Sequence, residues 1–279
     1  MKVVRAEYAG ACYGVQRALD MAAAASAEGR RACSLGPLIH NPQVVARLEA
    51  RGVREVARVD NVRDGEALVI RSHGVVPAVK ARAAARGLAV VDATCPHVAR
   101  AQKAAAALAG EGRHVIVVGE AGHPEVEGIE ACAREAGGAV DVVAVPDDLP
   151  AALDGPVGIV VQTTQTADAL QAVVGALRDR GVEPLVKDTI CFATRQRQEA
   201  AAALAGQVDA LVVIGGRNSS NTTRLADICA AACPRTYHVE APDELDPSWF
   251  AGCSTIGVTA GASTPEDQIE AVITRLESL

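Results

Sequence analysis

The chain has almost no aromatic residues, which make up 2% of its 279 positions. It also has no run of basic residues, and its formal net charge is −7. Proteins that take nucleic acid as their main ligand need cations for the phosphates and rings on which the bases stack. The composition therefore argues against nucleic acid as the main ligand. A small anionic substrate remains compatible with it if the binding site is locally positive.

Long hydrophobic stretches are absent as well. A membrane-spanning helix needs about 18 or more consecutive apolar residues, and the sequence contains no such run. The first residues, MKVVRAEYAG, are typical of a strand and lack the apolar core and cleavage site of a signal peptide. With 49% hydrophobic residues, the chain can still build a large core. We expect a globular protein of the cytoplasm that does not enter a membrane.

Paired cysteines are the third absence: the chain has eight cysteines but no C-x-x-C motif. Disulfide frameworks are typical of short secreted chains. In a long cytosolic chain, a cluster of cysteines indicates metal binding or catalysis rather than disulfide bonds. Cys229 and Cys233 lie four residues apart in an apolar, helix-like stretch and are expected to be core residues. We make the same prediction for Cys33, Cys132 and Cys253.

One pattern repeats along the chain: a short β-branched run, a polar or glycine-containing junction, and an alanine-rich amphipathic segment. AVVDATCPHVARAQKAAAAL is one example, with a strand expected at residues 88–91 and Pro96 at the first turn of the following helix. Strands that alternate with helices imply parallel sheets covered on both faces. The sequence predicts an α/β fold with mainly parallel sheets, in which ligands bind beyond the carboxyl ends of the strands.

Side chains capable of catalysis or ligand binding are concentrated in the junctions between these segments. They are Cys12, His40, His73, Cys95, His123, Glu125, Thr163, Thr164, Cys191, residues 218–221 and Ser263. Each type also has a structural alternative, because a free cysteine is often a packed residue and a serine or asparagine before a helix is often an N-cap. We interpret the concentration as the mark of an enzyme or a cofactor-binding protein.

Three of the cysteines are regularly spaced. Cys95 follows Cys12 by 83 residues, Cys191 follows Cys95 by 96, and 88 residues come after Cys191. This spacing predicts three small αβα domains in a pseudo-threefold trefoil around one centre. Their boundaries are expected at residues 13–95, 96–190 and 191–279, with residues 1–12 completing the third domain.

Three thiolates that converge in a reducing compartment suit zinc or an iron–sulfur cluster, since both take soft sulfur ligands. Zinc sites usually contain local cysteine pairs, which are missing here. Widely separated single cysteines are compatible with a 4Fe–4S cluster, in which three ligands would leave one iron open to substrate. An open iron implies chemistry at the metal.

Nine stretches, in this order, resemble a known family and extend from the first expected strand to the last expected helix. They are ACYGVQRA, IHNPQVV, RSHGV, DATCPHV, GHPEVEG, QTT, DTICFATRQRQ, RNSSN and TAGAS. Together they resemble the LytB (IspH) family of 4-hydroxy-3-methylbut-2-enyl diphosphate reductases, which act in the non-mevalonate pathway of isoprenoid synthesis. The sequence departs from the family pattern at Ala11 and Tyr13, which flank Cys12.

The resemblance implies roles for individual residues. Cys12, Cys95 and Cys191 would be the three ligands of a 4Fe–4S cluster with one open iron. Glu125 would be the proton source, with His123 and Thr163 beside the substrate hydroxyl. The substrate would be bound by His40, His73, His123, Thr163, Ser219, Ser220, Asn221 and Ser263, of which Thr163 would lie at the hydroxyl end and the others would contact the diphosphate. Histidines and helix N-termini would then supply the positive character that the net charge does not.

The implied reaction removes the hydroxyl group with two electrons and protons and forms isopentenyl diphosphate, dimethylallyl diphosphate and water. Ferredoxin or flavodoxin would supply the electrons. Quinolinate synthase is the rival enzyme, because it resembles the same three-domain, three-cysteine arrangement. A non-catalytic iron–sulfur sensor is the rival from another class. The motifs GHPEVEG and RNSSN favour the reductase, and a sensor would not need Glu125 and Thr163.

Overall fold

The structure is a computed structural model that describes residues 1–279, apart from the side chain of Glu28. The chain divides into two compact units, which are described separately here. Unit 1 consists of Met1–Val15, His40–Val44 and Phe192–Leu279, and unit 2 of Gln16–Ile39 and Val45–Cys191. None of the described helices combines the length and apolar character that crossing a bilayer requires.

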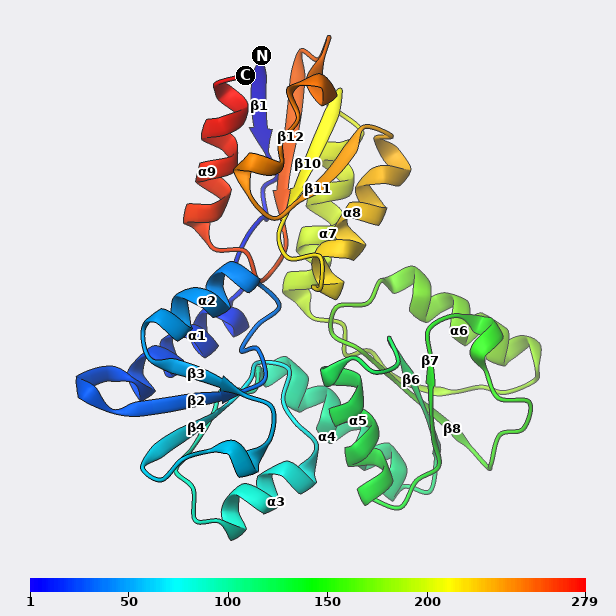
Figure 1. Ribbon diagram of the computed structural model, residues 1–279. Coiled ribbons are helices and arrows are strands. Elements are labelled where there is room, and N and C mark those ends of the chain that lie inside the picture. The colour runs from blue at the N-terminus through cyan, green and yellow to red at the C-terminus, as the bar shows by residue number, and fades with distance from the viewer. The chain divides into compact units, whose positions relative to one another are not determined.

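Unit 1 contains a four-stranded parallel sheet in the order β1-β12-β10-β11 (Figure 1). Its strands are β1 (Lys2–Arg5), β10 (Ala210–Ile214), β11 (Thr236–Val239) and β12 (Thr255–Ala260). Its helices are α7 (Phe192–Ala205), α8 (Ser220–Ala232) and α9 (Glu266–Glu277). The N-terminal strand thus pairs with a strand about 250 residues later, with Lys2 opposite Thr255.

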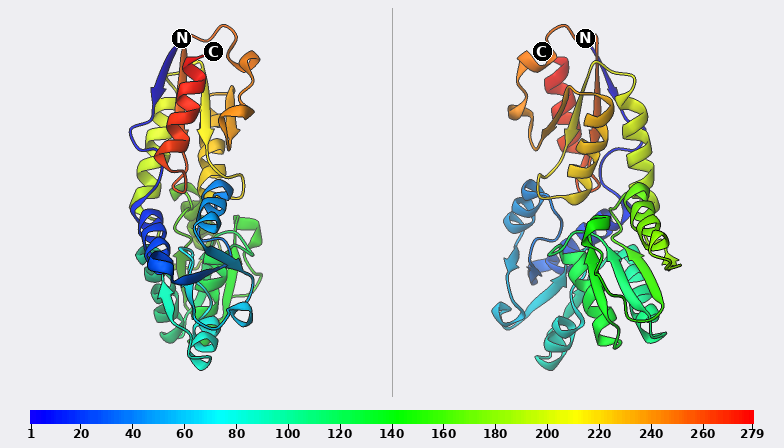
Figure 2. Two further views of the ribbon diagram at one scale, coloured as in Figure 1. Left: turned by 60° about the vertical axis from the view of Figure 1, so that its left-hand side comes forward. Right: turned by 90° about the vertical axis from the view of Figure 1, so that its right-hand side faces the viewer.

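Helices cover both faces of this sheet, as the uninterrupted apolar strand LVVI predicts. Leu211 and Val213 of β10 pack in the cluster formed by α7 and α8, whereas Val212 and Ile214 pack in the cluster formed by α9. The right-hand view of Figure 2 shows α9 and α7 on opposite sides of the strands. Successive residues of a strand point to opposite faces, so a doubly covered strand is apolar throughout.

Unit 2 contains two further parallel sheets. The first, in the order β3-β2-β4-β5, consists of β2 (Arg31–Leu35), β3 (Val53–Val56), β4 (Glu66–Ile70) and β5 (Val90–Asp92). The second, in the order β7-β6-β8-β9, consists of β6 (His114–Val118), β7 (Val140–Val143), β8 (Val157–Val161) and β9 (Leu185–Lys187). The helices are α3 (Pro77–Ala85), α4 (Pro96–Gly110), α5 (Pro124–Glu135) and α6 (Ala167–Asp179), while α1 (Tyr13–Ala25) and α2 (Pro42–Ala50) include residues of both units.

The sheet with β6 at its centre also has two covered faces. Val115 and Val117 of β6 pack with α4 and α5, and Ile116 and Val118 pack with α6. The three sheets share one strand order, which can be written β3-β2-β4-β5, β7-β6-β8-β9 and β11-β10-β12-β1. In the last of these, β1 takes the edge position that β5 and β9 hold in the other two. The predicted α/β class with parallel sheets is therefore confirmed.

Candidate active site

The three regularly spaced cysteines occupy equivalent positions in the three sheets. Each follows the fourth strand of its sheet and precedes a helix: Cys12 lies between β1 and α1, Cys95 between β5 and α4, and Cys191 between β9 and α7. All three residues are half-buried. In each case the carboxyl end of a parallel strand brings the thiol to the positive end of a helix dipole.

The backbone N–H groups of the three cysteines make equivalent hydrogen bonds in all three sheets. Each cysteine N–H donates a hydrogen bond to a carbonyl in the loop after the neighbouring strand. The pairs are Cys12 with Ala262 (3.0 Å), Cys95 with Ser72 (2.9 Å) and Cys191 with Thr163 (3.0 Å). Those loops carry Ser263, His73 and Thr163, so each cysteine lies next to a residue that the sequence predicts to be functional.

The local setting of these thiols fits an iron–sulfur cluster. Such clusters are ligated by cysteine thiolates, and their negative charge is favoured by the N-terminal ends of helices. Cys12 belongs to unit 1, and Cys95 and Cys191 belong to unit 2. Within the described part of the chain, no three His, Cys, Asp or Glu side chains form a ready metal site.

Glu125 is a buried carboxyl in the first turn of α5, with only 2% of its surface exposed. The Thr163 N–H donates to its Oε1 at 2.6 Å, and the Thr163 hydroxyl donates to its Oε2 at 2.9 Å. Burial raises the pKa of the Glu125 carboxyl from 4.5 to about 7, although both Thr163 bonds favour the charged form. A substantial share of Glu125 is therefore carboxylic acid at neutral pH.

Glu127, only two residues further along α5, is exposed. The helix turns its side chain away from the face that buries Glu125, so two glutamates of one motif lie in opposite environments. Glu127 therefore provides a matched comparison for any effect that depends on the burial of Glu125.

His123 is the N-cap of α5, and its Nδ1 accepts the N–H of Glu125 at 3.1 Å. Because Nδ1 is the acceptor, the neutral ring carries its proton on Nε2. Burial lowers the pKa of His123; Glu120 opposes this effect and Arg71 adds to it. The sequence predicts that the histidines supply positive charge, whereas burial favours a neutral ring at His123. The ring of His73 lies 5.7 Å away, edge-on.

The remaining predicted ligands for the diphosphate lie in unit 1, around the start of α8, in the loop after β12 and, for His40, in the segment before α2. Ser219 is the N-cap of α8 and accepts the N–H of Thr222 at 3.4 Å, which is the capping role that the sequence also allowed for this residue. Ser220 and Asn221 follow in the first turn. The Ser263 hydroxyl donates to the carbonyl of His40 at 3.1 Å, which joins two predicted site loops.

Asn221 stands out because its amide group is buried without a hydrogen-bond partner among the described residues. The residue is 5% exposed, and neither Oδ1 nor Nδ2 is satisfied. Buried polar groups are nearly always paired, so an unpaired amide in the first turn of a helix indicates a place for a polar ligand.

Sequence reasoning missed Asn41 as a residue of the site. Asn41 is 1% exposed, and its Nδ2 donates to the Ser263 carbonyl (3.0 Å) and to Gln268 Oε1 (2.9 Å). Its position directly before Pro42, at the start of α2, was the available signal, because asparagine before proline favours a helix start. Thr164, which the sequence placed among the junction residues without a specific role, has a buried hydroxyl with no partner in the described part of the chain.

Comparison with known proteins places this α/β protein in a family. The model of the LytB protein family matches residues 3–277. The chain is 48% identical to the 4-hydroxy-3-methylbut-2-enyl diphosphate reductase of Citrifermentans bemidjiense, over 100% of this chain and 98% of that protein. It is 47% identical to the enzyme of the same name from Geobacter sulfurreducens, over 99% of this chain and 97% of that protein. The chain belongs to the LytB family.

Two solved structures of such reductases resemble the whole chain. One, described as the terminal enzyme of the non-mevalonate pathway, has a TM-score of 0.73 and 42% identity and covers 100% of both chains. The other, from Plasmodium falciparum, has a TM-score of 0.89 and 26% identity and covers 98% of this chain and 87% of that one. The resemblance inferred from the nine sequence stretches is confirmed.

Proposed function

We propose that this protein catalyses the reductive dehydroxylation of 4-hydroxy-3-methylbut-2-enyl diphosphate in isoprenoid biosynthesis. The observation that carries the proposal is the buried Glu125 carboxyl bonded twice to Thr163, in a chain whose full-length relatives bear the name of this reductase. Removal of a hydroxyl group requires a proton, because hydroxide is a poor leaving group. A carboxyl with a pKa near neutrality is a suitable donor.

The reaction consumes one allylic alcohol, two electrons and two protons. The carbon–oxygen bond breaks, and the hydroxyl takes one proton and leaves as water. The other proton adds to the allylic skeleton at either end, which produces isopentenyl diphosphate or dimethylallyl diphosphate. We propose ferredoxin or flavodoxin as the electron donor.

Cys12, Cys95 and Cys191 are the proposed ligands of an iron–sulfur cluster. We propose the 4Fe–4S type, with three cysteine ligands and one open iron. When bound, this cluster supplies electrons and a Lewis acid for the substrate oxygen. The equivalent positions of the three cysteines at strand ends, each with its N–H bonded to a site loop, support this assignment.

Glu125 and Thr163 are the proposed path of the proton. The Thr163 N–H donates a hydrogen bond to Oε1 of Glu125. The acidic proton of Glu125 is therefore expected on Oε2, next to the Thr163 hydroxyl. That hydroxyl can accept this proton while it passes its own to the departing substrate oxygen. His123, with its proton on Nε2, is the proposed hydrogen-bond donor to the substrate.

The diphosphate is proposed to bind to His40, His73, Ser219, Ser220, Asn221 and Ser263, with His123 and Thr163 towards the hydroxyl end. The unpaired Asn221 amide supports this assignment, since its Nδ2 can donate to a phosphate oxygen. The start of α8 adds backbone N–H donors and the positive end of a helix dipole. Domain boundaries at 13–95, 96–190 and 191–279 with 1–12, and a location in the cytoplasm, remain part of the proposal.

Anaerobically purified and reconstituted protein provides the test. Iron and sulfide are measured first, and consumption of hydroxymethylbutenyl diphosphate with a reduced viologen dye is measured next. We expect a cluster and formation of both five-carbon diphosphates. A cluster without turnover of this substrate would overturn the reductase function and favour a quinolinate synthase or a sensor. Protein that binds no iron would overturn the cluster ligands as well.

A further inference from the structure

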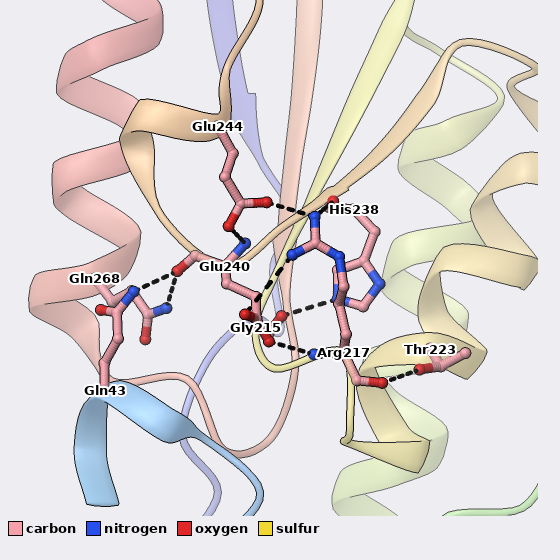
Figure 3. Close-up of polar contacts among 8 residues, drawn as sticks. All are labelled: Gln43, Gly215, Arg217, Thr223, His238, Glu240, Glu244 and Gln268. Carbon is pink, nitrogen blue, oxygen red and sulfur yellow. Dashed lines mark hydrogen bonds and ion pairs between the residues drawn. The ribbon is translucent and has the colours of Figure 1, made fainter. Parts of the chain in front are cut away.

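Glu240, the residue after β11, is bonded to the loop that leads into α8. Its Oε1 accepts the backbone N–H of Arg217 at 2.6 Å, and its Oε2 lies 3.7 Å from the Arg217 guanidinium (Figure 3). Arg217 is two residues before Ser219, at the start of the RNSSN motif. The carboxylate of Glu240 therefore holds the loop that carries three proposed ligands of the diphosphate.

Other groups fix the same loop residue. The Arg217 guanidinium donates to the His238 carbonyl at 3.2 Å and to the carboxylate of Glu244. Glu244 in turn accepts the N–H of Glu240 at 3.1 Å, and Thr223 donates to the Arg217 carbonyl at 3.3 Å. Arg217 is thus bonded through its N–H, its carbonyl and its side chain, as Figure 3 shows.

The carbonyl of Glu240 is bonded to two more segments. It accepts the side-chain amide of Gln43 at 2.8 Å and that of Gln268. Gln43 lies three residues after His40, and Gln268 lies in α9, five residues after Ser263. Asn41 joins these two segments by donating to both Ser263 and Gln268. One residue at the end of β11 is therefore bonded to all three unit 1 segments that carry proposed diphosphate ligands.

We propose that Glu240 is a positioning residue that sets the RNSSN loop at the correct distance from the segments of His40 and Ser263. Its carboxylate fixes the loop, while its carbonyl anchors the two other segments. The three segments then hold their donors in place before the anion arrives, which lowers the entropic cost of binding. This proposal rests on the proposed function and deepens it, since the ligand concerned is the substrate diphosphate.

The direction in which diphosphate affinity changes when the Glu240 carboxylate is removed distinguishes positioning from simple electrostatics. A carboxylate near an anion site repels the anion, so its removal alone should strengthen diphosphate binding. Removal would also leave the Arg217 cation without part of its compensation. If Glu240 acts by positioning, the same removal must weaken binding, because the loop loses its anchor.

The experiment compares Glu240→Ala and Glu240→Gln with Asp243→Ala in the anaerobically reconstituted protein. Asp243 is exposed and lies three residues from Glu240, so its removal changes the charge equally and leaves the network intact. Binding of inorganic diphosphate is measured by calorimetry, and KM and kcat per cluster are measured with the substrate. Glu240→Ala should raise both Kd and KM about tenfold, with kcat per cluster within about twofold of wild type. Glu240→Gln keeps an acceptor for the Arg217 N–H and should show a rise of about threefold.

Asp243→Ala should match the wild type or bind slightly more tightly. Unchanged or tighter diphosphate binding in both Glu240 variants would overturn the proposal. Should Glu240→Ala fail to fold, Glu240→Gln decides on the same criterion. A wild-type protein that neither binds diphosphate nor turns over the substrate would overturn the proposed function instead, so the two failures are distinguishable.

Discussion

The pH dependence of turnover should follow the protonation of Glu125. A glutamate with the ordinary pKa of 4.5 is in the acid form in about one molecule in 300 at pH 7, whereas a pKa of about 7 keeps about half in that form. Only the acid can give a proton to the leaving hydroxyl. We therefore expect kcat/KM to fall about tenfold for each pH unit above about pH 7, since this parameter reports the free enzyme.

Thr163→Val separates this titration from that of the substrate's own phosphate groups. The substitution removes the hydroxyl bond of 2.9 Å to Glu125 and keeps the backbone bond. Because the lost bond favours the carboxylate, its removal raises the pKa of Glu125. A hydrogen bond to a charged group contributes roughly 1.5 kcal/mol or more. The falling limb of the pH profile, where kcat/KM decreases with rising pH, should therefore move to higher pH by about one unit. Turnover should also decrease at every pH, because the relay hydroxyl is missing.

The assay is substrate consumption by anaerobic protein with a reduced viologen dye, over a pH series at constant ionic strength. Glu125→Gln should keep the iron and the substrate affinity but lose most turnover, whereas Glu127→Gln should match the wild type. Infrared difference spectra of wild type and Glu125→Gln would report the carboxylic acid directly. Wild-type turnover in Glu125→Gln, or a shift of the Thr163→Val limb to lower pH, would refute the reasoning.

Three further predictions concern the cluster, the anion site and stability. Cys95→Ala should lose stable cluster binding and all turnover, whereas Cys132→Ala should retain its iron; a chelator assay measures both. Asn221→Ala should weaken binding of inorganic diphosphate about tenfold in calorimetry, and unchanged affinity would contradict its role. Glu125→Gln should stabilise the fold relative to wild type at alkaline pH. The Glu125 carboxyl of the wild type has a higher pKa in the folded than in the unfolded state, so the free energy of unfolding falls as pH rises from about 4.5 to about 7. The loss is about 3 kcal/mol, and urea unfolding on both sides of that window measures it.

Local sequence signals predicted much of the secondary structure around the site. In AVVDATCPHVARAQKAAAAL the structure has a strand at Val90–Asp92, two residues later than residues 88–91 at its start, and α4 begins at Pro96 as expected. Proline is favoured in the first turn of a helix, because the N–H groups there have no partner within the helix and proline has no N–H to leave unpaired. This signal therefore depends only on neighbouring residues. Ser219 as an N-cap is predictable for the same reason.

The sequence by itself determined the α/β class, the placement of the cysteines at strand ends and, through its nine stretches, the family. These features depend on periodicity, turn chemistry and short motifs, which are local properties. Only the tertiary structure distinguished Glu125 from Glu127, because the difference lies in burial and in contacts with Thr163, 38 residues away. The sequence assigned residues 1–12 to the domain of residues 191–279, but the register in which β1 pairs with β12 and the network around Glu240 come only from the tertiary structure (Figure 3). Such long-range contacts arise from packing between segments, and no local pattern in the chain encodes them.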